Sequence, residues 1–349
     1  MANQRFGKTF SGYMKLRESF FDKDFNDAIV ERLHFADQLY LQQPKRTACK
    51  ICATDLRELT FKRNQVPYFL CDCCGHLNGG HEDTETYNQS LYEDEDSAIA
   101  TNSSYSDSDL EKYLFRVDNI YRPKADWLYR ELSVLDEHCS ELSVVDVGTG
   151  AGHMVKALID AGFKNSCGFD VYQPNLDLGN RMIGSNALFK SQIDSAVDLL
   201  GSLEAEVISS IFMLEHISQP LEWLRMLKRN PKIRYALIAV PMFSPTVVME
   251  LVFPHVMHRS LGLAHTHLFT RKSVDWMLKE TKIDIISEWW FGADAFDLHR
   301  NIYMHLKHHM HSAVLADLWD DMIEASLDNL QLSLDQNFGS SEVHLVVRV

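Results

Sequence analysis

Residues 144–153, VVDVGTGAGH, restrict the possible fold more than any other stretch of the chain. Three valines surround a single acid, Asp146, and glycines follow at positions 148, 150 and 152. A β-branched run followed by spaced glycines and an apolar helical pattern is typical of a buried strand, a tight turn and a helix N-terminus. Because glycine adopts positive φ and lets the backbone approach a ligand closely, this turn predicts a ligand site at the carboxyl end of the strand.

Strand and helix patterns alternate through the C-terminal part of the chain. The predicted strands are residues 142–147, 166–171, 206–214, 233–241, 282–292 and 342–349. Helical periodicity is found in residues 153–162, 220–230, 271–281 and 298–333. This alternation predicts an α/β fold, with a doubly wound, Rossmann-like open sheet and helices on both of its faces.

Changes in composition divide the chain into four segments. Residues 1–44 are predicted to form an N-terminal helical arm, and residues 45–80 a ribbon that contains five cysteines. Residues 81–140 are predicted to be an acidic connector followed by a helix, since residues 81–111 hold ten Asp or Glu and no Lys or Arg. Residues 141–349 are the predicted ligand-binding domain, with a helical insertion at about 293–340.

Charge and hydropathy exclude several classes of partner. The formal net charge of -15 disfavours nucleic acid, whose phosphates carry the same sign. No apolar run is long enough for a transmembrane helix, and the first twenty residues lack the apolar core of a secretory signal. We therefore expect a cytoplasmic protein without a membrane partner. The sequence does not predict the oligomeric state.

Two acids select the ligand of the glycine turn. Asp146, two residues before the first glycine, repels a pyrophosphate but attracts a cation such as an ammonium group. Asp170 ends the next strand at a spacing suited to binding the two hydroxyls of a ribose. A ligand with a ribose and a positive charge but no phosphate is required, and S-adenosylmethionine meets this description. The alternative is a nucleotide-binding relative, although the third glycine falls one residue early for the dinucleotide pattern.

Four motifs resemble those of the class I S-adenosylmethionine-dependent methyltransferases. They are VVDVGTGAGH, GFDVYQPN, EVISSIFMLEHISQPLEWLR and HTHLFTRKSVDWMLKETKI, in the order and spacing of that family. The resemblance covers residues 141–292 and the last strand. It implies a seven-stranded sheet whose last strand, 342–349, lies antiparallel beside the sixth, and it implies that the chain is an enzyme.

The resemblance also implies roles for particular residues. Gly148, Gly150 and Gly152 are expected at the methionine part of the cofactor, and Asp170 at its ribose. Gln192 and Ile193 are expected near the adenine, and Glu215 and His216 near the methyl group. The further expected cofactor contacts are Asp146, Thr149, Val171 and Met213.

The cysteines predict a metal site. CKIC and CDCC place Cys49, Cys52, Cys71 and Cys74 in two Cys-x2-Cys knuckles separated by eighteen residues. Four thiolates at this spacing are typical of a closed, tetrahedral Zn²⁺ site with a structural role. Cys73 is expected to be a free thiol, and His76 and His81 are the alternative ligands.

A zinc ribbon ahead of such a domain resembles a group of bacterial small-molecule methyltransferases, which includes sugar C-methyltransferases. This resemblance implies transfer of a methyl group to a small molecule such as a sugar or another biosynthetic metabolite. Two alternatives stay open. The ribbon could direct methylation of a macromolecule, or the chain could be a scaffold that binds the cofactor without catalysis.

Histidines are the natural general bases for this chemistry. His216 follows a predicted strand, and the alternative is a loop histidine that caps the next helix. Glu215 is expected to contact the cofactor's amino group or to orient His216. His265 and His267 alternate before a helix, so one of them is a candidate base or substrate contact, and a metal pair is the further possibility.

Overall fold

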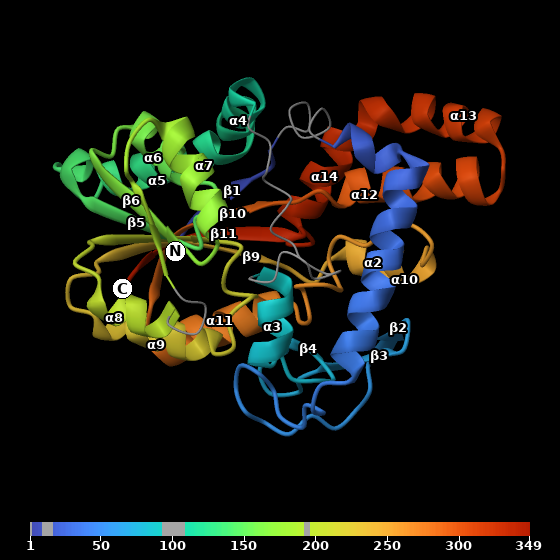
Figure 1. Cartoon of the computed structure of the whole chain (residues 1–349), viewed down its shortest axis with the longest axis horizontal. Helices are drawn as coiled ribbons and strands as arrows, with labels where there is room; N and C mark the ends of the chain where they lie inside the picture. Colours follow the sequence, from blue (N-terminus) through green and yellow to red (C-terminus); the bar gives the residue numbers. More distant parts are fainter. Residues whose placement is uncertain (1, 9–16, 93–108, 192–195) are drawn as a thin grey trace.

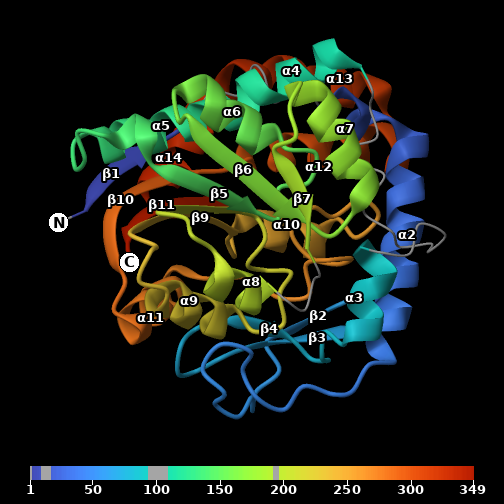
Figure 2. The ribbon, with the colours of Figure 1, turned by 60° about the vertical axis from the view of Figure 1, so that its left-hand side comes forward.

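A single sheet of eight strands forms the centre of the computed structural model, which describes residues 2–8, 17–92, 109–191 and 196–349 (Figures 1 and 2). The strand order is β1-β10-β11-β9-β8-β5-β6-β7. The strands are β1 (Asn3–Phe6), β5 (Ser143–Val147), β6 (Asn165–Asp170), β7 (Leu188–Lys190), β8 (Val207–Ile211), β9 (Tyr235–Pro241), β10 (Asp284–Phe291) and β11 (Glu342–Arg348).

The topology confirms the α/β, doubly wound class. All pairings are parallel except those of β11, which is antiparallel to both β9 and β10. Strand β5 lies between β6 and β8, where the direction of winding reverses along the sheet. The glycine turn therefore follows the strand at the topological switch point, which is where open α/β sheets bind their ligands.

The first strand, β1, was not expected. Residues 3–6 pair in parallel with β10 and extend the seven expected strands to eight, so the predicted helical arm 1–44 is not helical throughout. Trp289 donates a hydrogen bond from Nε1 to the carbonyl oxygen of Gly7 at 2.9 Å, and the Arg5 guanidinium lies 3.6 Å from the Trp289 ring centroid. A four-residue strand held by such distant contacts leaves no local pattern in the sequence.

Helices cover both faces of the sheet, and each buries an apolar stripe on it. On one face lie α5 (Arg122–Ser133), α6 (His153–Ala161) and α7 (Gln173–Ile183), and on the other α8 (Ala196–Ser202), α9 (Pro220–Arg229) and α11 (Arg271–Thr281) (Figure 1). In α9, Leu221, Trp223, Leu224 and Leu227 are all buried, as a helix with one core-facing side requires. Two apolar clusters, one on each face, form the core.

The remaining described helices precede, follow or connect these elements, and η4 directly precedes the amino end of β5. They are η1 (Glu18–Phe21), α2 (Lys23–Leu41), α3 (Glu85–Tyr92), α4 (Leu110–Arg116), η3 (Val117–Tyr121), η4 (Cys139–Glu141), α10 (Pro245–Val252), α12 (Asp294–Met304), η6 (His305–His309), α13 (Ala313–Ile323), η7 (Glu324–Ser326) and α14 (Leu327–Gln336). Elements α12 to α14 correspond to the expected insertion, and Phe20 of the arm packs against its Phe296 and Leu327. Among the described helices, none is both long and apolar enough to cross a membrane.

The cysteine segment folds as a small three-stranded antiparallel sheet of β2 (Phe61–Arg63), β3 (Val66–Leu70) and β4 (Leu77–Gly79). It lies against the segment that precedes α11, where Leu77 and Leu268 form an antiparallel bridge. The Thr270 hydroxyl donates to the carbonyl oxygen of Gly75 at 2.8 Å. The ribbon is thus joined to the loop that carries His265 and His267.

Candidate active site and cysteine cluster

The glycine turn after β5 has the backbone geometry that the sequence predicts. The amides of Gly148 and Thr149 both donate to the carbonyl oxygen of Phe169, at 2.9 and 3.0 Å. Gly148, Gly150 and Gly152 all have positive φ. A Cβ on Gly150 would meet no atom within 4 Å, so this glycine borders open space. A Cβ on Gly152 would lie 2.6 Å from Leu188, so Gly152 serves packing at the start of α6.

Asp170 closes the turn from the neighbouring strand. Its Oδ2 accepts a hydrogen bond from the Gly150 amide at 2.7 Å, and its Oδ1 accepts from the amides of Val171 and Tyr172 at 2.8 and 3.2 Å. Burial raises the pKa of Asp170, and these three amides oppose that rise. The carboxylate is therefore fixed in orientation beside the turn.

Asp146 is a buried acid without a full set of partners. Its side chain is 2% exposed, and its Oδ1 has no hydrogen-bond partner among the described residues. Burial raises the pKa of Asp146 to about 7, and the nearby hydroxyls of Ser209 and Thr149 only partly offset that rise. Such a group gains free energy from a positively charged ligand.

One large cavity, about 990 Å³ in volume, opens beside the turn. The predicted site residues that line it are Asp146, Gly148, Thr149, Gly150, Asp170, Val171, Met213, His216 and His265. Three others, Gly152, Glu215 and His267, do not line it. Gln192 and Ile193 lie outside the described residues, so their predicted adenine contacts stay predictions.

Glu215, His216 and His265 meet at the wall of this cavity. Glu215 is 1% exposed, and burial raises its pKa to about 8. His216 Nε2 lies 3.7 Å from Glu215 Oε1. The rings of His216 and His265 stack with centroids 5.2 Å apart. Burial lowers the pKa of His216 to about 3 and that of His265 to about 4, so both imidazoles are neutral at pH 7.

His267 points away from the cavity and toward the ribbon. Its Nδ1 lies 2.9 Å from Nε2 of His76, and burial holds the pKa of both rings well below the ordinary value. His267 therefore joins the ribbon to the main domain. This position does not support its predicted role as a base.

Several cavity residues gave no signal in the sequence. Lys124 lines the wall at 2% exposure, and burial lowers its pKa to about 7. Lys8 also lines it, and burial lowers its pKa to about 8. Phe212, which follows β8, has a φ of 54°, a strained conformation for a bulky residue and one that is common at functional sites. The predicted strand 206–214 included Phe212, whereas β8 ends at Ile211, so the sequence did not predict this backbone strain.

Segments distant from the glycine turn cover the cavity. Phe25, Ile29 and Arg32 of α2 line one side, and residues 257–260 with 263–265 line another. The second segment follows α10, within the apolar, Met-rich stretch 241–262 and just beyond it. The cavity is therefore built by the sheet, the arm and the segment between β9 and α11 together.

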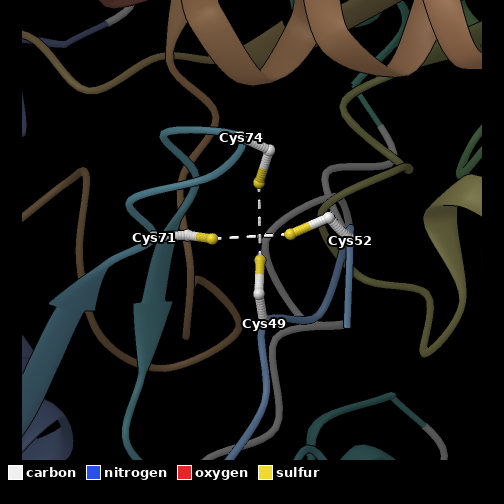
Figure 3. Close-up of side chains that lie close together, drawn as sticks. All are labelled: Cys49, Cys52, Cys71 and Cys74. Atoms are coloured by element: carbon white, nitrogen blue, oxygen red, sulfur yellow. Dashed lines mark hydrogen bonds between the residues drawn. The ribbon is translucent and has the colours of Figure 1, made fainter. Parts of the chain in front are cut away.

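The four predicted metal ligands converge at one point in the ribbon. Figure 3 shows their sulfur atoms pointing to a common centre from four sides. Cys49 and Cys74 Sγ lie 3.5 Å apart, and Cys52 and Cys71 Sγ 3.4 Å apart. Sulfur atoms bound to one tetrahedral Zn²⁺ at about 2.3 Å are about 3.8 Å from each other, close to these distances. Cys73 is exposed and lies outside the group, as expected.

Comparisons with known proteins give one match to a family model. Residues 118–288 match the family model described as a methyltransferase domain. The comparison with curated proteins finds no match. Among solved structures, the chain is similar to the [4+2]-cyclase SpnF, with 16% identity, a TM-score of 0.38, and 65% of this chain and 80% of that chain covered.

Two further solved structures are similar to the chain at low identity. One is magnesium protoporphyrin IX methyltransferase from Synechocystis PCC 6803 with bound SAH, with 13% identity, a TM-score of 0.38, and 51% of this chain and 79% of that chain covered. The other is a SAM-dependent methyltransferase from Archaeoglobus fulgidus, with 14% identity, a TM-score of 0.36, and 68% of this chain and 99% of that chain covered.

Proposed function

Since residues 118–288 match a family model described as a methyltransferase domain, we propose that this enzyme transfers the methyl group of S-adenosylmethionine to a small-molecule acceptor. In that reaction a lone pair of the acceptor attacks the methyl carbon. The bond between this carbon and the sulfonium sulfur breaks, and its electron pair stays on the sulfur. The protein contributes by aligning the acceptor with the methyl group at about 3–3.5 Å.

The described residues fit the cofactor on grounds of charge and space. Gly150 borders open space, so the backbone can approach the methionine part. The unpartnered oxygen of buried Asp146 suits the ammonium group. Asp170, fixed by three amides, suits the ribose hydroxyls. We place Thr149, Val171 and Met213 among the cofactor contacts and Gln192 and Ile193 near the adenine.

The cavity is the observation that carries the choice of a small acceptor. At about 990 Å³ it is at the upper end for ligand pockets, which leaves space beside the cofactor for a molecule of modest size. That space is lined by α2 and by residues 257–260 and 263–265. A groove open along its length would favour a macromolecule instead.

Labelling tests this assignment directly. Purified protein is incubated with methyl-labelled S-adenosylmethionine and cell extract, which is then separated into small-molecule, nucleic-acid and protein fractions. We expect label in the small-molecule fraction alone. Label in RNA or protein would support methylation of a macromolecule, and cofactor binding without transfer to any fraction would support a scaffold.

Asp170→Ala tests the cofactor site. We expect S-adenosylmethionine to bind about 10- to 100-fold more weakly, because two hydrogen bonds to a charged group are lost. The matched control is Asp177→Ala, an exposed acid of α7 that bonds only to Gln173 among the described partners. Calorimetry measures both affinities, and equal affinities in the two variants would refute the ribose assignment.

We also propose that Cys49, Cys52, Cys71 and Cys74 bind one structural Zn²⁺. Four thiolates fill the tetrahedral positions, so no position is open for a catalytic water. Cys49, Ile51, Cys71 and Cys74 are buried in the same apolar cluster as residues of α9 and α11. Metal binding then stabilises the ribbon on the main domain and the loop that leads to His265.

A further inference from the structure

The carboxylate of Glu215 is buried without the partners that such a group requires. Its two oxygens receive no hydrogen bond from another residue among those described, and the side chain is 1% exposed. The nearest basic atom that the structure records is His216 Nε2 at 3.7 Å, which is beyond hydrogen-bond distance. A buried carboxylate of this kind requires a proton or a cation.

The orientation of the two histidines favours a cation. His216 Nδ1 lies 3.3 Å from the carbonyl oxygen of Ala264, and since a carbonyl can only accept, Nδ1 carries the hydrogen. In the neutral ring, Nε2 then presents a lone pair toward Glu215. Backbone groups of Ser260 and Arg259 also form hydrogen bonds with the ring of His265. One nitrogen of that ring lies within 4.8 Å of ligand atoms of Glu215 and His216. Histidines fixed by backbone carbonyls, with the other nitrogen directed at a shared centre, are typical of metal ligands.

We propose that Glu215, His216 and His265 bind a divalent first-row transition-metal cation in the cavity wall. One ligand atom from each side chain lies within 4.8 Å of the other two. Two imidazoles and one carboxylate suit such a cation, and three protein ligands leave coordination positions open. His216 and His265 line the cavity with Glu215 behind them, so the cation is accessible from the acceptor space.

The open positions suit an acceptor with an oxygen donor, such as a hydroxyl or carbonyl group. The cation would hold that oxygen and lower the pKa of a hydroxyl proton. This role rests on the proposed methyl transfer, whereas cation binding itself does not. The site differs in chemistry from the cysteine group, whose four soft thiolates leave no open position.

Cobalt binding tests the proposal on the full-length protein. Exchangeable metal is removed under conditions that keep the ribbon zinc, and Co²⁺ is titrated by calorimetry and visible absorption. We expect one Co²⁺ per chain without thiolate-to-cobalt absorption. Glu215→Gln and His265→Ala should each weaken this binding by more than about tenfold. Thermal melting checks that both variants fold.

The control is His309→Ala. It breaks a second group, His255, His305 and His309, whose ligand atoms also lie within 4.8 Å of one another but which is not in the cavity. Two results would overturn the proposal. One is an equal cobalt affinity in wild type, Glu215→Gln and His265→Ala, and the other is a cobalt affinity that only His309→Ala reduces. Cofactor binding to the metal-free protein is measured separately, so failure of the proposed function is distinguished from failure of this site.

Discussion

Burial changes the pKa of Asp146 in a way that favours binding of a cationic ligand. Inside the fold its pKa is about 7, raised mainly by burial, against an ordinary value of 3.8. Because the folded pKa is the higher one, this residue makes the folded state less stable as pH rises from about 4 to 7. A bound ammonium group reverses the effect, since it favours the ionised carboxylate.

We therefore expect S-adenosylmethionine to release protons when it binds near pH 7, and to bind more tightly as pH rises through that range. Calorimetry in two buffers with different ionisation enthalpies measures the number of protons. Cofactor binding to Asp146→Asn should release fewer protons than binding to wild type. The difference between the two proteins gives the protons that come from Asp146 and not from Glu215. Equal proton release in both proteins would show that Asp146 does not face the ammonium group.

Gly150 and Gly152 share a positive φ but have different surroundings. Alanine at either position costs about 1–2 kcal/mol for the left-handed backbone. Only at Gly152 does the added Cβ meet packed side chains, Leu188 and Ile183, which costs a further 1–3 kcal/mol or so. We expect Gly152→Ala to lower the free energy of unfolding more, and Gly150→Ala to weaken cofactor binding more. Urea unfolding and calorimetry would show the prediction wrong if this order were reversed.

At the scale of elements, the sequence predicts the helices and strands whose ends are determined by nearby residues. Helix α11 spans residues 271–281 as expected, because Thr270 and Ser273 form a capping box at its start. Strand β5 and the glycine turn are likewise correct. Strand β1 was missed because its pairing with β10 joins residues far apart in the sequence. The sequence predicted His267 in the site because it alternates with His265. Alternation predicts which side of the chain a residue faces, but it does not predict that this side packs on the ribbon.

The cysteine ribbon is an element whose stability we expect to depend on metal. Cys71→Ser should bind one zinc fewer per chain than wild type and lower the free energy of unfolding by several kcal/mol, because the small sheet β2-β3-β4 has little core of its own. Cys73→Ser is the matched control, since this thiol is exposed and outside the cluster. Elemental analysis and thermal unfolding measure both effects. An equal zinc content in Cys71→Ser and Cys73→Ser would exclude the four-cysteine site.

At the scale of the whole molecule, the acceptor space is assembled from the two ends and the middle of the chain. The sheet provides the cofactor turn, α2 provides one wall, and residues 257–260 and 263–265 provide another. The arm is held in place by β1 at the sheet edge and by Phe20 against the α12–α14 insertion. Segments outside the predicted sheet thus line the cavity that we propose for the acceptor.

Ile29→Trp tests whether α2 lines the acceptor space and not the cofactor site. Ile29 lines the cavity from α2, so a larger side chain there reduces the acceptor space without touching the glycine turn. We expect a raised KM for the acceptor that labelling identifies, with cofactor affinity within about twofold of wild type, because that site is separate. Phe35→Trp is the control, since Phe35 lies on the same helix but is 43% exposed and outside the cavity. If Ile29→Trp weakened cofactor binding as much as acceptor binding, α2 would cover the cofactor, and the acceptor would have to bind elsewhere in the cavity.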